Sequence, residues 1–167
     1  MSSSSAFSAA VLMICIAGSA AAQHAKDRVK DIEGGWILVS SINEVDGQKT
    51  DQFGPHPNGM LVLGSDGRFM LTIIGAGLPK FASNNRANGT PEENKAVVSR
   101  SIAMIGTYVV DAEASTLTLR TENATFPNWD GTEQRRLIVT LNADELKYVT
   151  PNASGGGVGI VIWKRAH

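Results

Sequence analysis

Cysteine is almost missing from this sequence of 167 residues, because Cys15 is the only one. Cys15 lies in an apolar segment near the N-terminus that we expect to be removed from the mature chain. The mature chain then has no thiol, which excludes a disulfide framework, a catalytic thiolate and a metal site built on cysteine. We therefore expect burial of apolar side chains to stabilise the fold.

Histidine is also scarce, with only His24, His56 and His167. None of the three has a second histidine or a carboxylate at the spacing of a metal site, so we predict no metal and no cofactor. No Gly-x-Ser-x-Gly motif is present, and no serine has an evident histidine partner. The sequence therefore indicates no catalytic residue. It leaves enzyme activity open but favours a protein that is not an enzyme.

The sequence also has no large excess of positive or negative charge, since it contains 15 basic and 16 acidic residues and its net charge is −1. The basic pairs Arg135–Arg136 and Lys164–Arg165 are too short to form a nucleic-acid patch, so we predict no nucleic-acid partner. The glycine-rich run 155–159 precedes a strand and not a helix. It therefore favours flexibility or close strand packing over phosphate binding.

Long hydrophobic runs are missing, and the apolar segment 9–17 is too short to span a bilayer. Ala20-Ala21-Ala22 follows it and is typical of a signal-peptide cleavage site. The segment before it has no Lys or Arg, which departs from the usual pattern. We predict a signal peptide over residues 1–22, cleaved after Ala22, and a secreted or periplasmic protein with no stable membrane insertion after cleavage.

Strands with β-branched and aromatic residues dominate what remains. The first, Gly34–Ile42, begins Gly-Gly-Trp-Ile-Leu-Val, and the last, Gly159–Arg165, ends Ile-Trp-Lys-Arg. Strict alternation would place Trp36 and Leu38 on one face with Ser40 and Ile42. If the first and last strands pair, the sheet closes into a barrel without exposed edges. Arg165 would then stack on or beside Trp36.

Six further segments have strand and turn patterns, so that eight strands are expected. The predicted strands cover residues 34–42, 60–63, 68–74, 103–111, 116–122, 132–141, 145–150 and 159–165. Between the third and fourth of these, Thr90-Pro91-Glu92-Glu93 has the pattern of a capping box and predicts a helix to about Ser101. We expect this helix to lie across one barrel end as a lid. The fold class is thus all-β: an eight-stranded antiparallel up-and-down barrel over residues 34–167, with one inserted helix, after a lead-in segment 23–33.

Polar and aromatic side chains near the expected barrel mouth are candidate ligand contacts. An inward Arg136 would need an anionic ligand head; the alternatives are a structural salt bridge or an outward side chain. Phe126 and Trp129 flank Pro127 and form either an aromatic rim or a cap on the core. Tyr108 either offers its hydroxyl to a ligand or is bonded to the backbone. His56 lies in a proline-rich loop, where it either contacts a ligand at the barrel mouth or is simply exposed to solvent.

Several stretches resemble the lipocalin-like domain family. They are Gly35-Trp36, residues 53–59 with 66–68, residues 106–108 with Asp111, and residues 127–134 with Arg136. The resemblance covers nearly the whole mature chain and implies a barrel with a ligand-sized interior, without implying a reaction. Relatives often carry tyrosines where this chain has Met60, Leu63 and Met104, and a His pair where it has Leu119-Arg120. Met104 and Leu119 are therefore expected to be apolar ligand contacts.

The favoured function is binding of a small apolar or amphipathic molecule inside the barrel. The first alternative is a barrel enzyme, an isomerase, cyclase or hydrolase, that uses cavity groups as acid and base on a small hydrophobic metabolite. The second is a barrel packed solid, which acts as an interaction or stress module. A binder needs an apolar void with few titratable groups, an enzyme needs two inward ionisable groups, and a packed barrel has neither.

Overall fold

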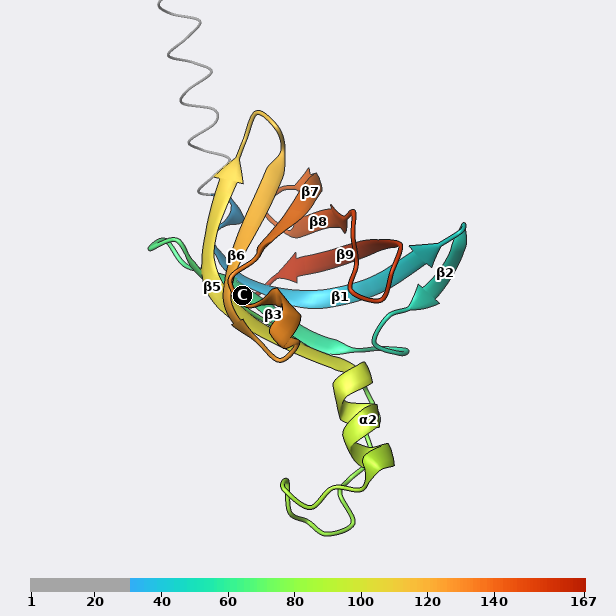
Figure 1. Ribbon diagram of the computed structural model, residues 1–167. Helices are drawn as coiled ribbons and strands as arrows, with labels where there is room; N and C mark the ends of the chain where they lie inside the picture. Colours follow the sequence, from blue (N-terminus) through green and yellow to red (C-terminus); the bar gives the residue numbers. More distant parts are fainter. Residues whose placement is uncertain (1–30) are drawn as a thin grey trace, which may run out of the picture.

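The computed structural model describes residues 31–167, in which nine strands form one antiparallel sheet (Figure 1). The strands are β1 (Gly34–Val45), β2 (Gln48–Asp51), β3 (Asn58–Leu63), β4 (Arg68–Ile74), β5 (Ser101–Asp111), β6 (Thr116–Ala124), β7 (Glu133–Leu141), β8 (Glu145–Thr150) and β9 (Val158–Arg165). The helices are α2 (Pro91–Ser99) and the 3-10 helix η1 (Pro127–Trp129). The predicted signal peptide and residues 23–30 of the lead-in lie outside the described residues.

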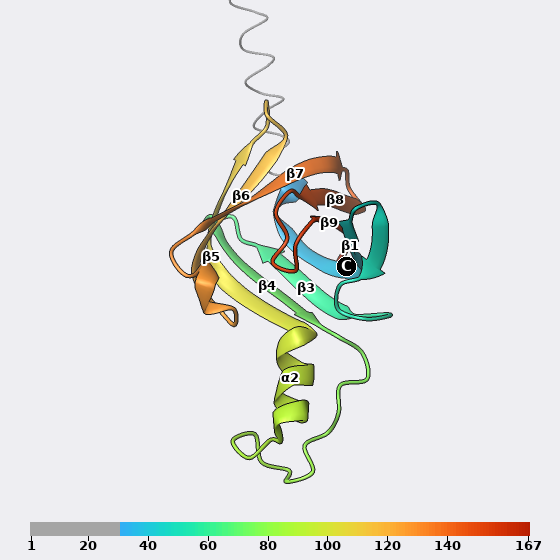
Figure 2. The same ribbon diagram turned by 45° about the vertical axis from the view of Figure 1, so that its right-hand side comes forward.

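Pairing of the first and last strands closes the barrel, as predicted. β1 pairs with β9 over a long register that runs from Trp36 opposite Arg165 to Glu44 opposite Val158. β3 to β9 follow in chain order, so eight strands surround a common interior (Figures 1 and 2). The predicted eight-stranded barrel is confirmed. Within residues 31–167, no helix is both long enough and apolar enough to span a membrane.

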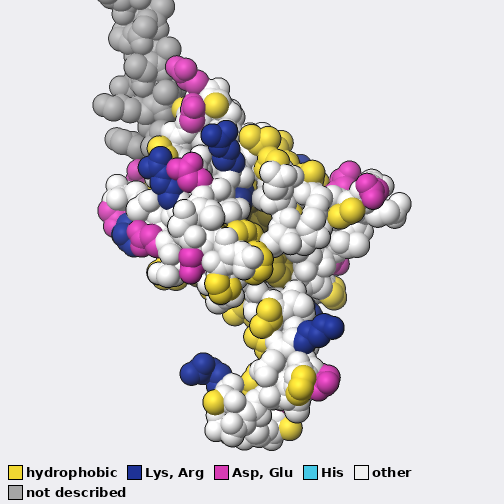
Figure 3. Space-filling model, in the orientation of Figure 1, with side chains coloured by type: hydrophobic (Ala, Val, Ile, Leu, Met, Phe, Trp, Pro, Cys, Tyr) yellow, Lys and Arg dark blue, Asp and Glu magenta, His cyan; other side chains and the backbone are white. Residues whose placement is uncertain are grey.

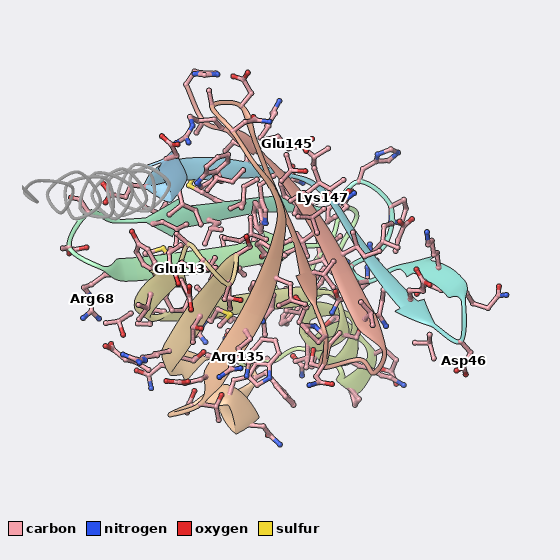
Figure 4. All side chains as sticks on the ribbon, turned by 90° about the horizontal axis from the view of Figure 1, so that it is seen from above. Asp46, Arg68, Glu113, Arg135, Glu145 and Lys147 are labelled. Atoms are coloured by element: carbon pink, nitrogen blue, oxygen red, sulfur yellow. The ribbon has the colours of Figure 1, made fainter. Side chains whose placement is uncertain are left out.

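One strand was not predicted from the sequence. β2 pairs only with the end of β1, and together they form a hairpin that projects from the barrel. Asp46 marks the tip of this hairpin at the margin of the molecule (Figure 4). All four β2 residues are exposed and none is apolar, so the hydrophobic pattern that reveals a half-buried strand is missing.

A bulge in β1 overturns the predicted face assignment. The register with β9 shifts between Leu38 and Ser40, which leaves Val39 as the extra residue, and its side chain is 52% exposed. One extra residue exchanges the two faces of a strand from that point on. Trp36 and Leu38 are therefore buried together with Ser41 and Asn43, and not with Ser40 and Ile42.

Inward side chains of all the barrel strands form one hydrophobic core. The largest of its fully buried members are Trp36, Trp163 and Tyr148, and leucines from β3, β6 and β8 fill the space between them. The barrel is consequently filled by side chains over part of its length, as expected for a barrel of eight strands.

The inserted helix has the predicted start but not the predicted position. Thr90 Oγ1 accepts from the Glu93 N–H, and Glu93 accepts in return from the Thr90 N–H, which completes the capping box. The Glu93 carboxylate also accepts from the Ala82 N–H, and these hydrogen bonds lower its pKa. However, α2 points away from the barrel in both views, and Val98 is 74% exposed. The expectation of a lid is wrong.

Candidate functional site

A cavity of about 50 Å³, partly open to solvent, lies at the barrel end formed by the β2–β3 connection, η1 and the β8–β9 loop. We call this the cavity end. Its apolar wall consists of Phe53, Leu71, Ile73, Ile102, Met104 and Val161. Its polar lining includes Ser41, Gln52, Arg136, Tyr148 and Thr150. The cavity admits a few water-sized groups, whereas complete drug-sized sites measure about 300–1,000 Å³.

A second hollow, a groove of about 640 Å³, is lined by residues 133–137 of β7 on one side and by residues 150–152 on the other. Trp129, Arg136 and Thr150 line both the cavity and the groove, so the two spaces adjoin at these three side chains. The space-filling view shows a hollow with hydrophobic side chains between η1 and the β8–β9 loop (Figure 3). The cavity and the groove together offer one continuous candidate site.

A gap in the barrel wall explains why the groove exists. β7 pairs with β6 from Glu133 to Leu137, but its pairing with β8 begins only at Leu137 opposite Val149. Residues 133–136 therefore have no strand partner on the β8 side. The Arg136 guanidinium replaces part of this missing strand pairing, because its Nη1 donates to the Arg135 carbonyl at 3.0 Å.

Arg136 is the central polar residue of this site. Its side chain points inward and is only 4% exposed, and its guanidinium carbon lies 5.8 Å from the centre of the Tyr148 ring. Within residues 31–167, the ion pairs are Lys49–Glu44, Arg68–Glu122 and Arg120–Glu133, so no carboxylate of this part pairs with Arg136. Of the three alternatives for Arg136, the structure thus shows an inward charge, without a salt bridge in this range.

Burial shifts the pKa values of both Arg136 and Tyr148. Loss of hydration lowers the pKa of the guanidinium, and the neighbouring Tyr148 acts in the opposite direction. Burial likewise raises the pKa of the Tyr148 hydroxyl, while the positive charge of Arg136 draws it back down. At neutral pH the pair is therefore a guanidinium cation beside a protonated phenol. It offers hydrogen-bond donors and a net positive charge.

The β8–β9 loop is held over β1 by close backbone contact. Gly157 has φ 70°, and a Cβ there would lie 2.2 Å from the Glu44 carbonyl oxygen, so only glycine fits. The buried Asn43 donates from Nδ2 to the Gly156 carbonyl, while its Oδ1 has no partner. The glycine-rich run thus serves close packing, which is one of the two predicted roles.

The aromatic residues predicted at the mouth take different positions. Trp129 is half-buried and lines both the cavity and the groove. Phe126 is 38% exposed and packs edge-on against Trp129, with ring centres 5.6 Å apart. Neither hollow includes Phe126 in its lining. Trp129 is therefore positioned as a contact, and Phe126 as its support.

Three other predicted contacts lie elsewhere. Tyr108 donates its hydroxyl to the Gly64 carbonyl at 2.8 Å, which is the backbone alternative. Burial, with Glu33 and Asp66 nearby, raises its pKa to about 12. Leu119 is fully buried in the core but does not line the cavity. His56 is an exposed loop residue with φ 53°, outside the cavity lining.

The opposite barrel end, which we call the Trp36 end, is sealed by Arg165. Its guanidinium carbon lies 4.1 Å from the centre of the Trp36 ring. Nε donates to the Ala143 carbonyl, Nη1 to that of Glu33 and Nη2 to that of Asp31. Each of the three guanidinium nitrogens of Arg165 is therefore engaged by a backbone carbonyl.

Several lining residues were missed from the sequence, Tyr148, Ser41, Gln52 and Thr150 among them. Alternation along Glu145–Thr150 places Leu146 and Tyr148 on one face, so this pattern could have identified Tyr148 as inward. Ser41 faces inward only because of the bulge at Val39, and Gln52 follows the unpredicted strand β2. No local pattern distinguishes these two residues.

The model of the lipocalin-like domain family matches residues 33–166. The chain belongs to this family. The match covers the whole barrel, from just before the first strand to just after the last. In this lipocalin-like domain, Leu63 and Met104 are buried, but Met60 is 45% exposed and faces outward. Of these three positions, at which the resemblance implied tyrosines, two thus place apolar side chains in the interior.

A crystal structure of a lipocalin-like protein from Bacteroides uniformis is similar to this chain. The similarity covers 81% of this chain and 99% of that one, at 14% sequence identity and a TM-score of 0.45. No curated protein matches the chain. The family assignment therefore stands on the match to the family model.

Proposed function

We propose that this lipocalin-like barrel is a secreted or periplasmic binder of a small amphipathic molecule. The observation that supports the proposal is the cavity itself, which is apolar on most of its wall and has Arg136 and Tyr148 as its only ionisable lining residues. The apolar part of the ligand would enter the cavity. Its polar part would remain where the cavity meets the groove. Secretion rests on the predicted signal peptide 1–22.

Burial of apolar ligand surface would supply the affinity, at roughly 25 cal/mol for each Å² removed from water. Leu71, Ile73 and Met104 offer such surface at fixed positions on two paired strands. The small cavity limits how much of a ligand can be enclosed without rearrangement. We therefore expect either a small ligand or a larger one that extends into the groove.

The ionisable lining of the cavity favours binding over catalysis. Arg136 and Tyr148 are the only ionisable residues among those that line it. An arginine keeps its proton in proteins, and burial raises the pKa of the Tyr148 hydroxyl above its usual range. A general acid–base pair would need a group with a pKa near the working pH. Among residues 31–167, no three His, Cys, Asp or Glu side chains converge as a possible metal site. The enzyme alternative thus has less support.

The test is to fill the cavity from β9. Gly159 lines the cavity, and a Cβ there would meet Thr150 and Ala153 at ordinary contact distances of 3.4 and 3.7 Å. Gly159→Val should therefore fold and occupy the space. Native mass spectrometry of the purified protein should find a co-purified small molecule on the wild type. That molecule should be lost from the variant.

The matched control is Val158→Ile, which changes the neighbouring, outward residue and should keep the bound molecule. Displacement of an apolar fluorescent dye provides a second measurement where no molecule co-purifies. A wild type that binds neither a co-purified molecule nor the dye would contradict the proposal. So would equal dye binding by wild type and Gly159→Val.

A further inference from the structure

The position of Arg136 carries an inference about the chemical class of the ligand. A buried guanidinium is costly unless its charge and its donors are matched. Nη1 donates to the Arg135 carbonyl, and the Tyr148 hydroxyl is the other hydrogen-bonding neighbour of this side chain. Within residues 31–167, no carboxylate pairs with the guanidinium, which has five N–H donors. A ligand group is the natural match for the remaining donors.

The surroundings of Arg136 favour a negative charge. The cavity lining contains no carboxylate, and the groove lining contains only Glu133, which is already paired with Arg120 at 2.9 Å. The protonated Tyr148 hydroxyl adds a donor on the cavity side. Thr150, which lines both hollows, brings another hydroxyl. The local charge is therefore positive, and the local hydrogen-bonding groups are mainly donors.

The shape of the site indicates which space the apolar part of such a ligand would occupy. Arg136 lies at the junction, with the apolar cavity of about 50 Å³ on one side and the open groove on the other. A simple inorganic anion would use the donors but leave the apolar wall empty. A planar carboxylate matches the guanidinium fork, and a short hydrocarbon attached to it fits the cavity.

We propose that the site binds a monocarboxylate with a short apolar substituent, its carboxylate held by Arg136 at the junction of cavity and groove. This inference rests on the proposed binding function and names the ligand class for it. The carboxylate reaches Arg136 through the gap between β7 and β8. Trp129, which stands beside this gap, covers the bound group.

The experiment compares hexanoate with hexanamide, which has nearly the same shape but no charge. Binding to the purified protein is measured by calorimetry in 0.15 M salt. The indole N–H signal of Trp129 reports binding at the site by nuclear magnetic resonance. We expect the wild type to bind hexanoate at least tenfold more tightly than hexanamide.

Arg136→Met should reduce the ratio of the two affinities to about one. Arg136→Lys keeps the charge but loses the planar fork, so it should retain only part of the ratio. The matched control is Arg68→Met, which removes an exposed arginine that lines neither the cavity nor the groove and is labelled in Figure 4. A screened surface charge contributes little, and the ratio should change by less than about twofold.

Three outcomes separate this inference from the proposed function. Equal binding of hexanoate and hexanamide by the wild type overturns the inference and leaves the binding function intact, whatever the variants do. Inorganic phosphate that binds as tightly as hexanoate also overturns it, because the apolar substituent would then be irrelevant. Failure of both probes and of the apolar dye contradicts the binding function as well.

Discussion

Arg165 and Arg136 lie toward opposite ends of one barrel, and each guanidinium faces an aromatic ring. At the Trp36 end, Arg165 stacks 4.1 Å from its ring and donates to three backbone carbonyls. At the cavity end, Arg136 lies 5.8 Å from the Tyr148 ring and donates to one carbonyl. Arg165 thus joins segments of the backbone at one end of the barrel, whereas Arg136 makes only one backbone hydrogen bond at the other.

The two tyrosines of the chain repeat this difference. Tyr108, near the Trp36 end, donates its hydroxyl to the Gly64 carbonyl. Tyr148 lines the cavity beside Arg136, and its pKa reflects both burial and that positive charge. At the Trp36 end, the arginine and the tyrosine are thus held by backbone carbonyls, whereas at the cavity end they face each other at the site where we propose that the ligand binds. Substitutions at each end should separate stability from binding.

Replacing Arg165 should have the largest effect on stability. Arg165→Met removes hydrogen bonds to three carbonyls and the stacking on Trp36, and we expect a loss of about 3 kcal/mol in the free energy of unfolding. Urea denaturation measures this loss. Lys164→Met, at the exposed neighbouring position, is the control and should change stability by less than about 0.5 kcal/mol. A loss below about 1 kcal/mol for Arg165→Met would contradict the structural role.

Replacing Arg136 should affect stability in the opposite direction or hardly at all. Arg136→Met removes a buried charge that has no carboxylate partner within residues 31–167, at the expense of the bond to the Arg135 carbonyl. We expect the free energy of unfolding to stay level or to rise by about 1 kcal/mol. The same urea titration tests this. A loss above about 2 kcal/mol would show that Arg136 stabilises the fold as Arg165 does.

Removing the Tyr108 hydroxyl should have a smaller effect than removing the Arg165 side chain, and this effect should depend on pH. Tyr108→Phe loses one hydrogen bond and should lower stability by about 1 kcal/mol at neutral pH. The folded-state pKa of about 12 lies above the usual 10.0, so the folded state holds this proton more tightly. The stabilisation is therefore complete below pH 10 and is lost as the pH rises toward 12.

The measurement is the difference in unfolding free energy between wild type and Tyr108→Phe, followed from pH 8 to about pH 12. This difference should shrink over the upper two pH units. Because Tyr148 is present in both proteins, its own titration cancels. A difference that stays constant up to pH 12 would mean that the Tyr108 hydroxyl is not held by the fold.

Local patterns in the sequence predicted the features that depend on neighbouring residues. β-Branched and aromatic runs identified the eight barrel strands, and the Thr90–Glu93 pair identified the start of α2. The pairing of the first and last strands followed from the need to close the sheet, and Arg165 was expected beside Trp36 on that basis. Arg136 was a candidate because a charge on a strand with mixed faces is conspicuous.

Features that depend on the assembled barrel were not predictable in this way. The Val39 bulge is a property of the β1–β9 register, and it moves Ser41 and Asn43 to the interior. The direction of α2 depends on the loop 75–90, whose course has no periodic signal. The cavity depends on how side chains from six barrel strands and the surrounding loops meet, so Tyr108 and Leu119 were expected as contacts while Tyr148 was missed.

The pairing of β1 with β9 also has a consequence for how the protein is made. A ribosome completes β1 more than a hundred residues before Val158–Arg165, which forms one of its two edges. Contacts this distant in sequence slow folding, and an unpaired strand edge attracts other chains meanwhile. During synthesis, one edge of β1 therefore stays open to aggregation until the final eight-residue strand has been made and has paired with it.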